Sequence, residues 1–477
     1  MEKLEELNQL NITDLPDFAQ NLSQSLKKKY EAYHQIDVLK SPHSLDGIFS
    51  YVIPEYARDI IDLEIKKVHF VNIFRQFQTF IEMESQLSSY FTQEEVPESK
   101  IIFPVENKSL ENFNIAAVDG SFVRKCYTNF EFALFRAISV IYSIKSENVD
   151  IKYYPEIDGF QNYRMSRIMD NVTEQVTNSQ VSIDLALMEI RLVNDLLTKY
   201  PDKLDMIILD GSILAEPLNL LSYSSQNTEL MTSYSYLVNE YRKLYDLCDL
   251  RKVDLVGIIK DTRSSTFRKL ISRRIPQILA KLNNLKLTQI DYRKLLPHFS
   301  DLDLFHRILE TGDRSCVFSI NSAGTSWIPR QLEILKSEIK PHHTFLKEYL
   351  FYACYMKPVQ YDFPIRIEIH QNRKNGKPEI IQSKIHRICE NLYPLCSKFE
   401  NFAIPIPQIE AHLRAKLTHN DLQIVINSLT RQISEEVKNY AKKMIFNHLD
   451  NEISRNFDEF LLSNNFLVPK RRERMPL

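Results

Sequence analysis

Two short apolar runs end in the same tripeptide, Asp-Gly-Ser, and they restrict the fold more than any other part of the sequence. They are "IAAVDGS" at residues 115–121 and "MIILDGS" at residues 206–212, in a chain that has only eight glycines. Runs of this length and composition, followed by turn residues, are typical of β-strands. The second run is apolar without interruption, which indicates a strand buried on both faces by covering helices.

The segments around these runs predict an α/β domain. After a break at "EEVPESK", three strand-like runs joined by short turns predict an antiparallel meander over residues 115–118, 130–144 and 149–154. Helices and strands then alternate along the chain. The expected elements are a helix at 181–200, a strand at 205–210, a helix near 225–250, a strand at 253–260, a basic helical region and a strand at 361–370.

Long helical segments flank this domain. Residues up to about 95 keep apolar residues at helical spacing, and the chain is helical again from about Gln408 to about Leu462, before the basic tail "VPKRRERMPL". We therefore predict a helical N-terminal arm over 1–100, the α/β domain over 101–415, and C-terminal helices with a basic tail over 416–477.

Composition narrows the class of protein. At 477 residues and 44% hydrophobic the chain can bury a large core, and its apolar stretches are shorter than the ~18 to 20 residues that a membrane span requires. The start lacks the pattern of a signal peptide, so we expect a cytoplasmic protein without a membrane partner. Six cysteines occur singly with no C-x-x-C pair, which favours free thiols over a zinc site.

The charge is close to neutral overall but uneven along the chain. The net charge of −2 does not indicate a nucleic-acid binder, yet residues 260–294 carry ten Lys or Arg against only two Asp. Such a segment can follow a phosphate backbone, although a solvated helix face explains any single residue equally well. The candidates for phosphate contacts are Lys260, Arg263 and Arg268.

The two Asp-Gly pairs allow two interpretations. Asp-Gly is a strong signal for a tight turn, and for Asp119 alone the turn is the better explanation. Asp210 instead lies at the carboxyl end of a buried strand, where α/β sheets build their sites. If the two strands are neighbours, their carboxylates lie side by side, which is costly unless a cation joins them.

A third acidic residue lies on the helix between the two runs. On a helical wheel of residues 181–200, Glu189 falls at the centre of an apolar stripe formed by Leu185, Ala186, Leu192, Val193 and Leu196. Glu189 therefore points toward the sheet. It is either a buried carboxylate paired with an Arg or with backbone donors, or a ligand that joins Asp119 and Asp210 around hard divalent cations.

The order of these pieces resembles the NurA nuclease family. "AAVDGS", a Glu-bearing helix, "IILDGS", "LVGIIKD", "IRIEI" and "IPIPQIEAH" follow one another over roughly residues 110–420. The resemblance implies an α/β, ribonuclease H-like mixed sheet with flanking helices. It also implies a manganese-dependent DNA nuclease, with Mg²⁺ as the other candidate ion, that has 5'-3' exonuclease and single-strand endonuclease activity. Such nucleases are usually homodimers and act with the hexameric HerA translocase on DNA ends.

The resemblance also assigns site residues. Asp119 and Asp210 match the aspartates of two family motifs, Glu189 matches the helical glutamate, and His412 matches the histidine that ends "IPIPQIEAH". In this assignment Asp119 bridges two ions, Asp210 and Glu189 complete their ligand shells, and His412 is a ligand or assists proton transfer. The family tyrosine is replaced by Ile404, which leaves the positioning of the scissile phosphate open; the nearby "LYP" at 392–394 is a displaced relic or a coincidence.

Two other functions compete with this assignment. A catalytically weak regulatory subunit would keep the fold and dock a translocase through the helical arms, and Ile404 supports it. A sugar-kinase or actin-like ATPase also pairs strands with Asp-Gly, but its phosphate loops are richer in Gly and Thr than "DGSFVRKC". On the strand "PIRIEIH", Arg366, Glu368 and His370 share one face, which is exposed, ion-paired or catalytic.

Overall fold

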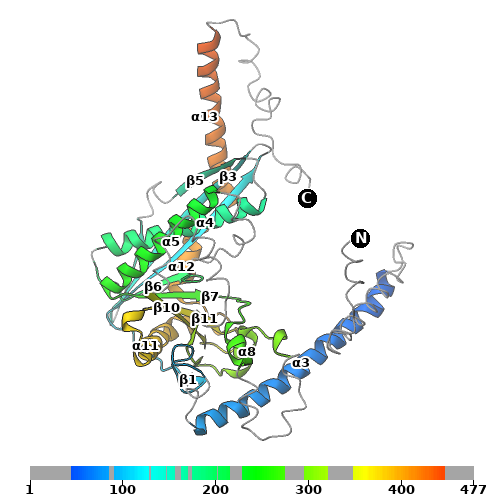
Figure 1. Ribbon diagram of the computed structural model, residues 1–477. Helices are drawn as coiled ribbons and strands as arrows, with labels where there is room; N and C mark the ends of the chain where they lie inside the picture. Colours follow the sequence, from blue (N-terminus) through cyan, green and yellow to red (C-terminus); the bar gives the residue numbers. More distant parts are fainter. Residues whose placement is uncertain are drawn as a thin grey trace. The chain divides into compact units, whose positions relative to one another are not determined.

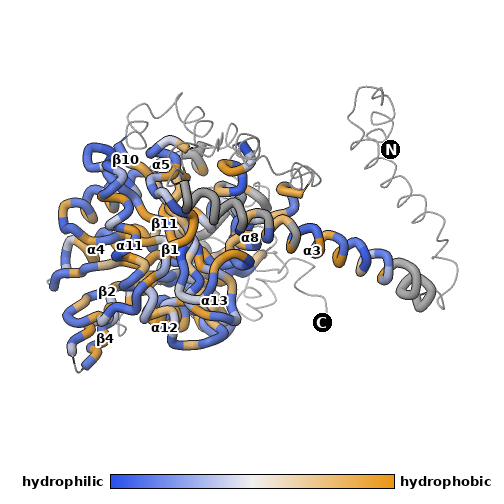
Figure 2. Tube along the Cα trace, turned by 90° about the horizontal axis from the view of Figure 1, so that it is seen from below, coloured by the Kyte–Doolittle hydropathy of each residue, from blue (hydrophilic) through white to orange (hydrophobic). Residues whose placement is uncertain are grey.

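The computed structural model describes residues 45–84, 91–127, 130–146, 148–155, 163–169, 174–200, 202–214, 228–273, 295–320 and 348–445. The chain divides into two compact units, Met1–Asn72 and Ile73–Leu477. Within the predicted helical arm the structure has helix α3 (Leu45–Glu84), along which apolar and polar residues alternate (Figure 2). The rest of the arm and the basic tail lie outside the described residues.

The predicted meander and the alternating helices and strands form the centre of one mixed sheet. Strands β2 (Phe113–Cys126), β3 (Phe130–Ile144) and β4 (Val149–Tyr154) are antiparallel neighbours. Strand β6 (Met206–Asp210) runs parallel to β2, and β7 (Asp254–Ile259) runs parallel to β6. The connections run through helices α4 (Glu174–Lys199) and α5 (Thr228–Arg251). This arrangement, β4-β3-β2-β6-β7, is a ribonuclease H-like core, as predicted.

The sheet continues beyond β7 through strands of the later part of the chain. Strand β11 (Ile365–Asn372) pairs antiparallel with β7, and β10 (Tyr349–Lys357) pairs antiparallel with β11. Three short strands complete this side: β1 (Ile102–Pro104), β8 (Asp313–Ser315) and β9 (Phe318–Ser319). Short α8 (Asp301–Ile308) precedes β8.

The polar segment before α4 contains a strand that the sequence does not indicate. Strand β5 (Tyr163–Met169, "YRMSRIM") pairs along the far half of β3. Its sequence has no clear alternation of apolar and polar residues. It forms because β3 extends past β4 and leaves backbone donors and acceptors that need a partner.

Helices cover both faces of the sheet. Helices α4 and α5 lie together on one face, with α4 packed on β2 and β3, while α12 (Ile406–Ala415) packs on the other (Figure 1). A large apolar cluster joins the strands to α12 and α11 (Pro378–Cys396). Helix α13 (His419–Ile445) packs Leu422 against the β2–β3 hairpin.

The alternation of side chains along each strand assigns residues to the two faces. On β2, Ile115 and Ala117 belong to the cluster on the α12 side, so Asp119 faces the same way. By the same rule Gly120 faces α4. On β6, Met206 and Ile208 face α12, and Asp210 follows in phase.

The cysteine prediction from composition is confirmed within the described residues. All six cysteines are buried free thiols. None of the helices in the described ranges has a stretch that is both long enough and apolar enough to cross a membrane.

We expect Gly257→Ala to destabilise the fold by about 1–3 kcal/mol, because a Cβ there would overpack the chain that follows β6. The added carbon would lie 2.6 Å from the carbonyl oxygen of Gly211 and 2.8 Å from the Ile213 side chain. Urea unfolding measures the loss. Gly376→Ala is the matched control, since its nearest contact is the flexible end of Leu350. Equal unfolding free energies in the two variants would contradict this account of Gly257.

Candidate metal centre

Asp119 lies in the middle of a long strand, not at a turn. It pairs with Ile138 of β3, and β2 continues in extended form to Cys126, so the turn interpretation of the first Asp-Gly is wrong. The parallel pairing with β6 ends one residue earlier, at Val118 and Leu209. Asp119 and Asp210 therefore follow the last paired residues of two adjacent parallel strands, on the same face of the sheet.

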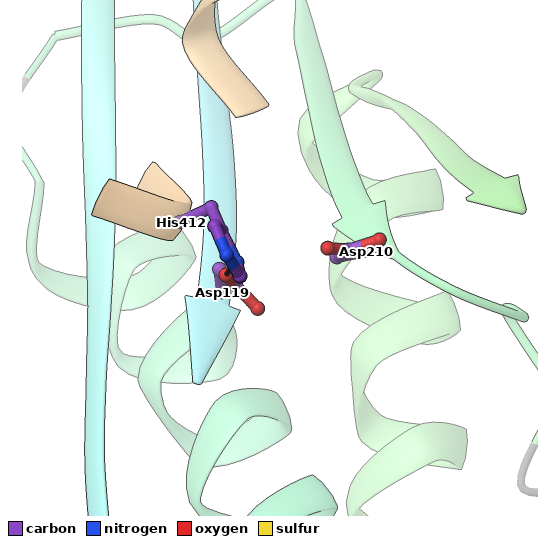
Figure 3. A group of neighbouring side chains, drawn as sticks. All are labelled: Asp119, Asp210 and His412. Carbon is purple, nitrogen blue, oxygen red and sulfur yellow. Dashed lines mark hydrogen bonds and ion pairs between the residues drawn. The ribbon is translucent and has the colours of Figure 1, made fainter. Parts of the chain in front are cut away.

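His412 completes this group from the covering helix. Ligand atoms of Asp119, Asp210 and His412 all lie within 4.8 Å of one another (Figure 3). The Nδ1 atom of His412 is 2.8 Å from Oδ2 of Asp119. The imidazole is 60% exposed, so its other nitrogen is accessible from solvent. The sequence alone gave His412 no more than the character of a surface residue, and only the family resemblance pointed to it.

The position of α12 depends on the strand that carries Asp119. The amide of Leu417, just after α12, donates to Oγ of Ser121, two residues beyond Asp119 on the same face. Ala411, next to His412, is fully buried in the apolar cluster. Helix α12 is therefore held by the packing of Ala411 and by the hydrogen bond of Leu417 after its C-terminal end. These two contacts direct His412 toward Asp119.

Glu189 lies against the same strand from the opposite face. Its side chain occupies the space beside Gly120, where a Cβ would come within 2.4 Å of Oε1. Burial, together with the charges of Asp119 and Asp210, raises the pKa of Glu189 to about 8, against a lowering by the Gly120 backbone. Glu189 thus has a backbone partner at Gly120. Gly120 is therefore required for this close approach of Glu189, and not for the tight turn that the Asp-Gly signal favours.

The second glycine does make the expected turn. Gly211 adopts a φ of +119°, which L side chains rarely adopt, and its amide donates to Ile258 of β7. Lys260, which follows β7, donates from Nζ to Oδ2 of Asp210 at 2.9 Å. Lys260 therefore lies at the site, as the phosphate-contact hypothesis requires.

The three carboxylates repel one another. Burial and the charge of Asp210 raise the pKa of Asp119, although the hydrogen bonds from His412 and from the Gly120 amide lower it. Carboxylates crowded at one point resist ionisation unless cations compensate them. An oxygen-rich group with one imidazole is a donor set that suits Mn²⁺ or Mg²⁺, so the residues fit a divalent cation.

The other predicted residues have different positions. Arg268 donates to the backbone carbonyl of Leu296, so its side chain serves a structural contact, and Arg263 is exposed on the segment after β7. The remainder of the basic segment, from 274, lies outside the described residues. Ile404 is buried in the apolar cluster, and Tyr393 of "LYP" lies on α11 with its hydroxyl beside Gly312.

The face shared by Arg366, Glu368 and His370 is buried, which excludes the exposed interpretation. Arg366 Nη2 and Glu368 Oε1 form an ion pair at 2.6 Å with both side chains almost fully buried. His370 stacks on Tyr245 of α5 at 5.1 Å between ring centroids. The sequence gave no signal that Glu368 also contacts the residues after Asp210, because that contact joins distant segments.

Comparison with known proteins assigns the family. The NurA domain family model matches residues 113–396, more than half of the chain. The chain belongs to the NurA family. Among curated proteins no sequence matches it.

Solved NurA structures are similar to this chain at low sequence identity. The NurA nuclease from Sulfolobus solfataricus is 13% identical, with 80% of this chain and 98% of that chain covered at a TM-score of 0.44. A NurA structure with manganese is 12% identical, covering 76% and 97% at a TM-score of 0.35. One bound to dAMP and manganese is 12% identical, covering 80% and 94% at a TM-score of 0.31. The family assignment rests on the domain match and not on these values.

We expect Glu189→Gln to stabilise the cation-free protein at pH 8 but not at pH 5. The folded state binds the Glu189 proton more tightly than the unfolded chain does, because the pKa rises from 4.5 to about 8. The wild-type protein therefore loses stability as the pH rises from about 4.5 toward 8, whereas glutamine does not ionise.

Thermal unfolding in EDTA at the two pH values measures this difference. Asp195→Asn is the control, since Asp195 lies on the same helix, half exposed, and pairs with Lys199. A Glu189→Gln midpoint that follows the wild type at both pH values would show that Glu189 ionises without penalty.

Proposed function

We propose that this NurA-family chain is a divalent-metal-dependent deoxyribonuclease that hydrolyses phosphodiester bonds, with Mn²⁺ as the preferred ion and Mg²⁺ as the alternative. The observation that carries the proposal is the convergence of Asp119, Asp210 and His412 within 4.8 Å, with Glu189 against the strand of Asp119. A scaffold would gain nothing from crowding these acids, since their mutual repulsion destabilises the fold.

The four side chains would hold the cations. Asp119 and Asp210 would hold them from adjacent strands, His412 from α12 and Glu189 from α4. Bound cations supply a Lewis acid for the phosphate and lower the pKa of a bound water. A related solved structure carries both dAMP and manganese, which supports DNA as the substrate class.

The chain's own groups would complete the chemistry. For proton transfer, the Nδ1–H of His412 donates a hydrogen bond to Asp119, which orients the ring and leaves the exposed Nε2 free to accept or return a proton. Lys260 can exchange its contact with Asp210 for a phosphate oxygen, because a cation bound by Asp210 would replace the ammonium charge. Both groups are placed at the edge where the parallel strands end.

We further propose that the activities are those of a 5'-3' exonuclease and a single-strand endonuclease, in a homodimer that acts with a HerA-type translocase in DNA end resection and repair. The family supports these assignments. The alternative, a catalytically weak regulatory subunit of the translocase complex, is supported by Ile404, whose side chain is buried in the apolar core where the family has a tyrosine.

End-labelled single- and double-stranded DNA, incubated with the purified full chain and Mn²⁺, Mg²⁺ or EDTA, separates enzyme from regulatory subunit. We expect cleavage with Mn²⁺, weaker cleavage with Mg²⁺ and none with EDTA. Binding of DNA or of the translocase without cleavage under all three conditions would favour the regulatory subunit.

We expect Asp119→Asn and Asp210→Asn each to lower the cleavage rate by about 10³-fold or more, because loss of a ligand to a catalytic ion removes several kcal/mol of transition-state stabilisation. Single-turnover cleavage measures the rates, and circular dichroism checks the fold. Asp254→Asn is the matched control: Asp254 is also a largely buried aspartate of the parallel strands, but it starts β7 and pairs with Arg387. Wild-type rates in a folded Asp119→Asn or Asp210→Asn protein would refute the site.

A further inference from the structure

The turn that follows Asp210 is held by a buried glutamate from a different strand. Oε2 of Glu368 accepts a hydrogen bond from Oγ of Ser212 at 2.7 Å and another from the amide of Ile213 at 3.2 Å. Glu368 belongs to β11 and is 1% exposed. It pairs with Gly257 of β7, the strand next to β6, so its carboxylate passes across β7 to reach the residues after Asp210.

The turn after Asp210 makes further hydrogen bonds and close contacts. Gly211 bonds to β7 through its amide, and the carbonyl of Ile213 accepts from the hydroxyl of Tyr245 at 2.5 Å. Gly257 leaves room for the turn beneath it. Glu368 is the charged member of this set, and charge-assisted hydrogen bonds are stronger than neutral ones.

Glu368 is in turn held by a second buried charge. Arg366 Nη2 lies 2.6 Å from Oε1 of Glu368, so one carboxylate oxygen binds the guanidinium while the other binds the turn. Arg366 also lies in the electrostatic field of Asp301, which is fully buried.

Asp301 holds the other segment at this edge. Its carboxylate accepts from the amides of Phe267 and Arg268, at 2.9 and 2.8 Å, at the start of the helical residues 266–273. That segment follows Lys260, the partner of Asp210. Asp301, whose charge acts on Arg366, thus holds the segment that follows β7.

We propose that Glu368, supported by Arg366 and Asp301, is a positioning residue that fixes the Asp210 carboxylate for cation binding. The inference rests on the proposed function, since it assigns how one of its ligands is oriented. Glu368 does not touch the cations or the substrate; it acts through Ser212 and Ile213. Residues that orient ligands in this way affect metal affinity by about 10- to 100-fold.

A second buried ion pair provides a matched control for the loss of stability that breaking the Glu368–Arg366 pair would cause. Glu98 pairs with Arg314 at 2.7 Å, both almost fully buried, and Oε2 of Glu98 accepts from the amide of Val317 at 2.7 Å. Glu98→Gln therefore breaks an equivalent ion pair without removing a contact of the turn after β6. Ser212→Ala removes one contact of Glu368 without breaking an ion pair, and Ser212→Thr keeps the hydroxyl.

The experiment measures the Mn²⁺ dissociation constant of the full chain by calorimetry, beside thermal unfolding and the KM and kcat for DNA. We expect Glu368→Gln to weaken Mn²⁺ binding by about 10-fold or more and to lower kcat with little change in KM. Glu98→Gln loses similar stability but binds Mn²⁺ as the wild type does. Ser212→Ala weakens binding to a smaller extent, and Ser212→Thr restores it.

Two results would overturn the inference: wild-type Mn²⁺ affinity in both Glu368→Gln and Ser212→Ala, or an equal loss of affinity in Glu98→Gln. If Glu368→Gln does not fold, the Ser212 pair decides alone. If the wild type neither binds Mn²⁺ nor cleaves DNA, the proposed function fails. Hydrogen exchange of residues 210–214 then tests separately whether Glu368 and Ser212 hold the turn after Asp210. Faster exchange there in Ser212→Ala than in Ser212→Thr supports it, and equal exchange rejects it.

Discussion

The parallel pairing of β2 with β6 is the constraint on which the candidate site depends. The pairing of these two strands ends at Val118 and Leu209. Asp119 and Asp210 are therefore the first residues beyond the β2–β6 pairing, and they lie at the same edge of it. Because side chains alternate along a strand, a shift of one residue would turn either carboxylate to the opposite face of the sheet. The site thus follows from one register, which the buried apolar residues of both strands fix.

That register places like charges together, and the surrounding structure tolerates them through specific contacts. His412 and the Gly120 amide offset part of the repulsion at Asp119, and Lys260 contacts Asp210. Glu189 has the backbone of Gly120 beside it, and its pKa rises to about 8. Crowded carboxylates with incomplete compensation are the usual state of a cation site before its ion binds.

The family match and the candidate site do not have the same limits along the chain. The NurA family match covers residues 113–396, and the helix that carries His412 lies just beyond it. In that helix region Ile404 packs into the apolar core. Ile404 thus serves packing in this chain, while Lys260 contacts Asp210 at the candidate site.

The sequence by itself determined the type and order of the central elements, because long apolar runs and helical stripes are local signals. The runs 130–144 and 149–154 are strands at the predicted bounds, and Glu189 points at the sheet as its apolar stripe indicates. It did not determine that Asp119 sits inside a long strand, since Asp-Gly has the same local signal in a turn. Strand β5 and the contact of Glu368 with Ser212 were decided only by the tertiary structure. Both depend on partners far away in the sequence, which supply backbone hydrogen bonds to a weakly patterned segment and a buried charge to a turn.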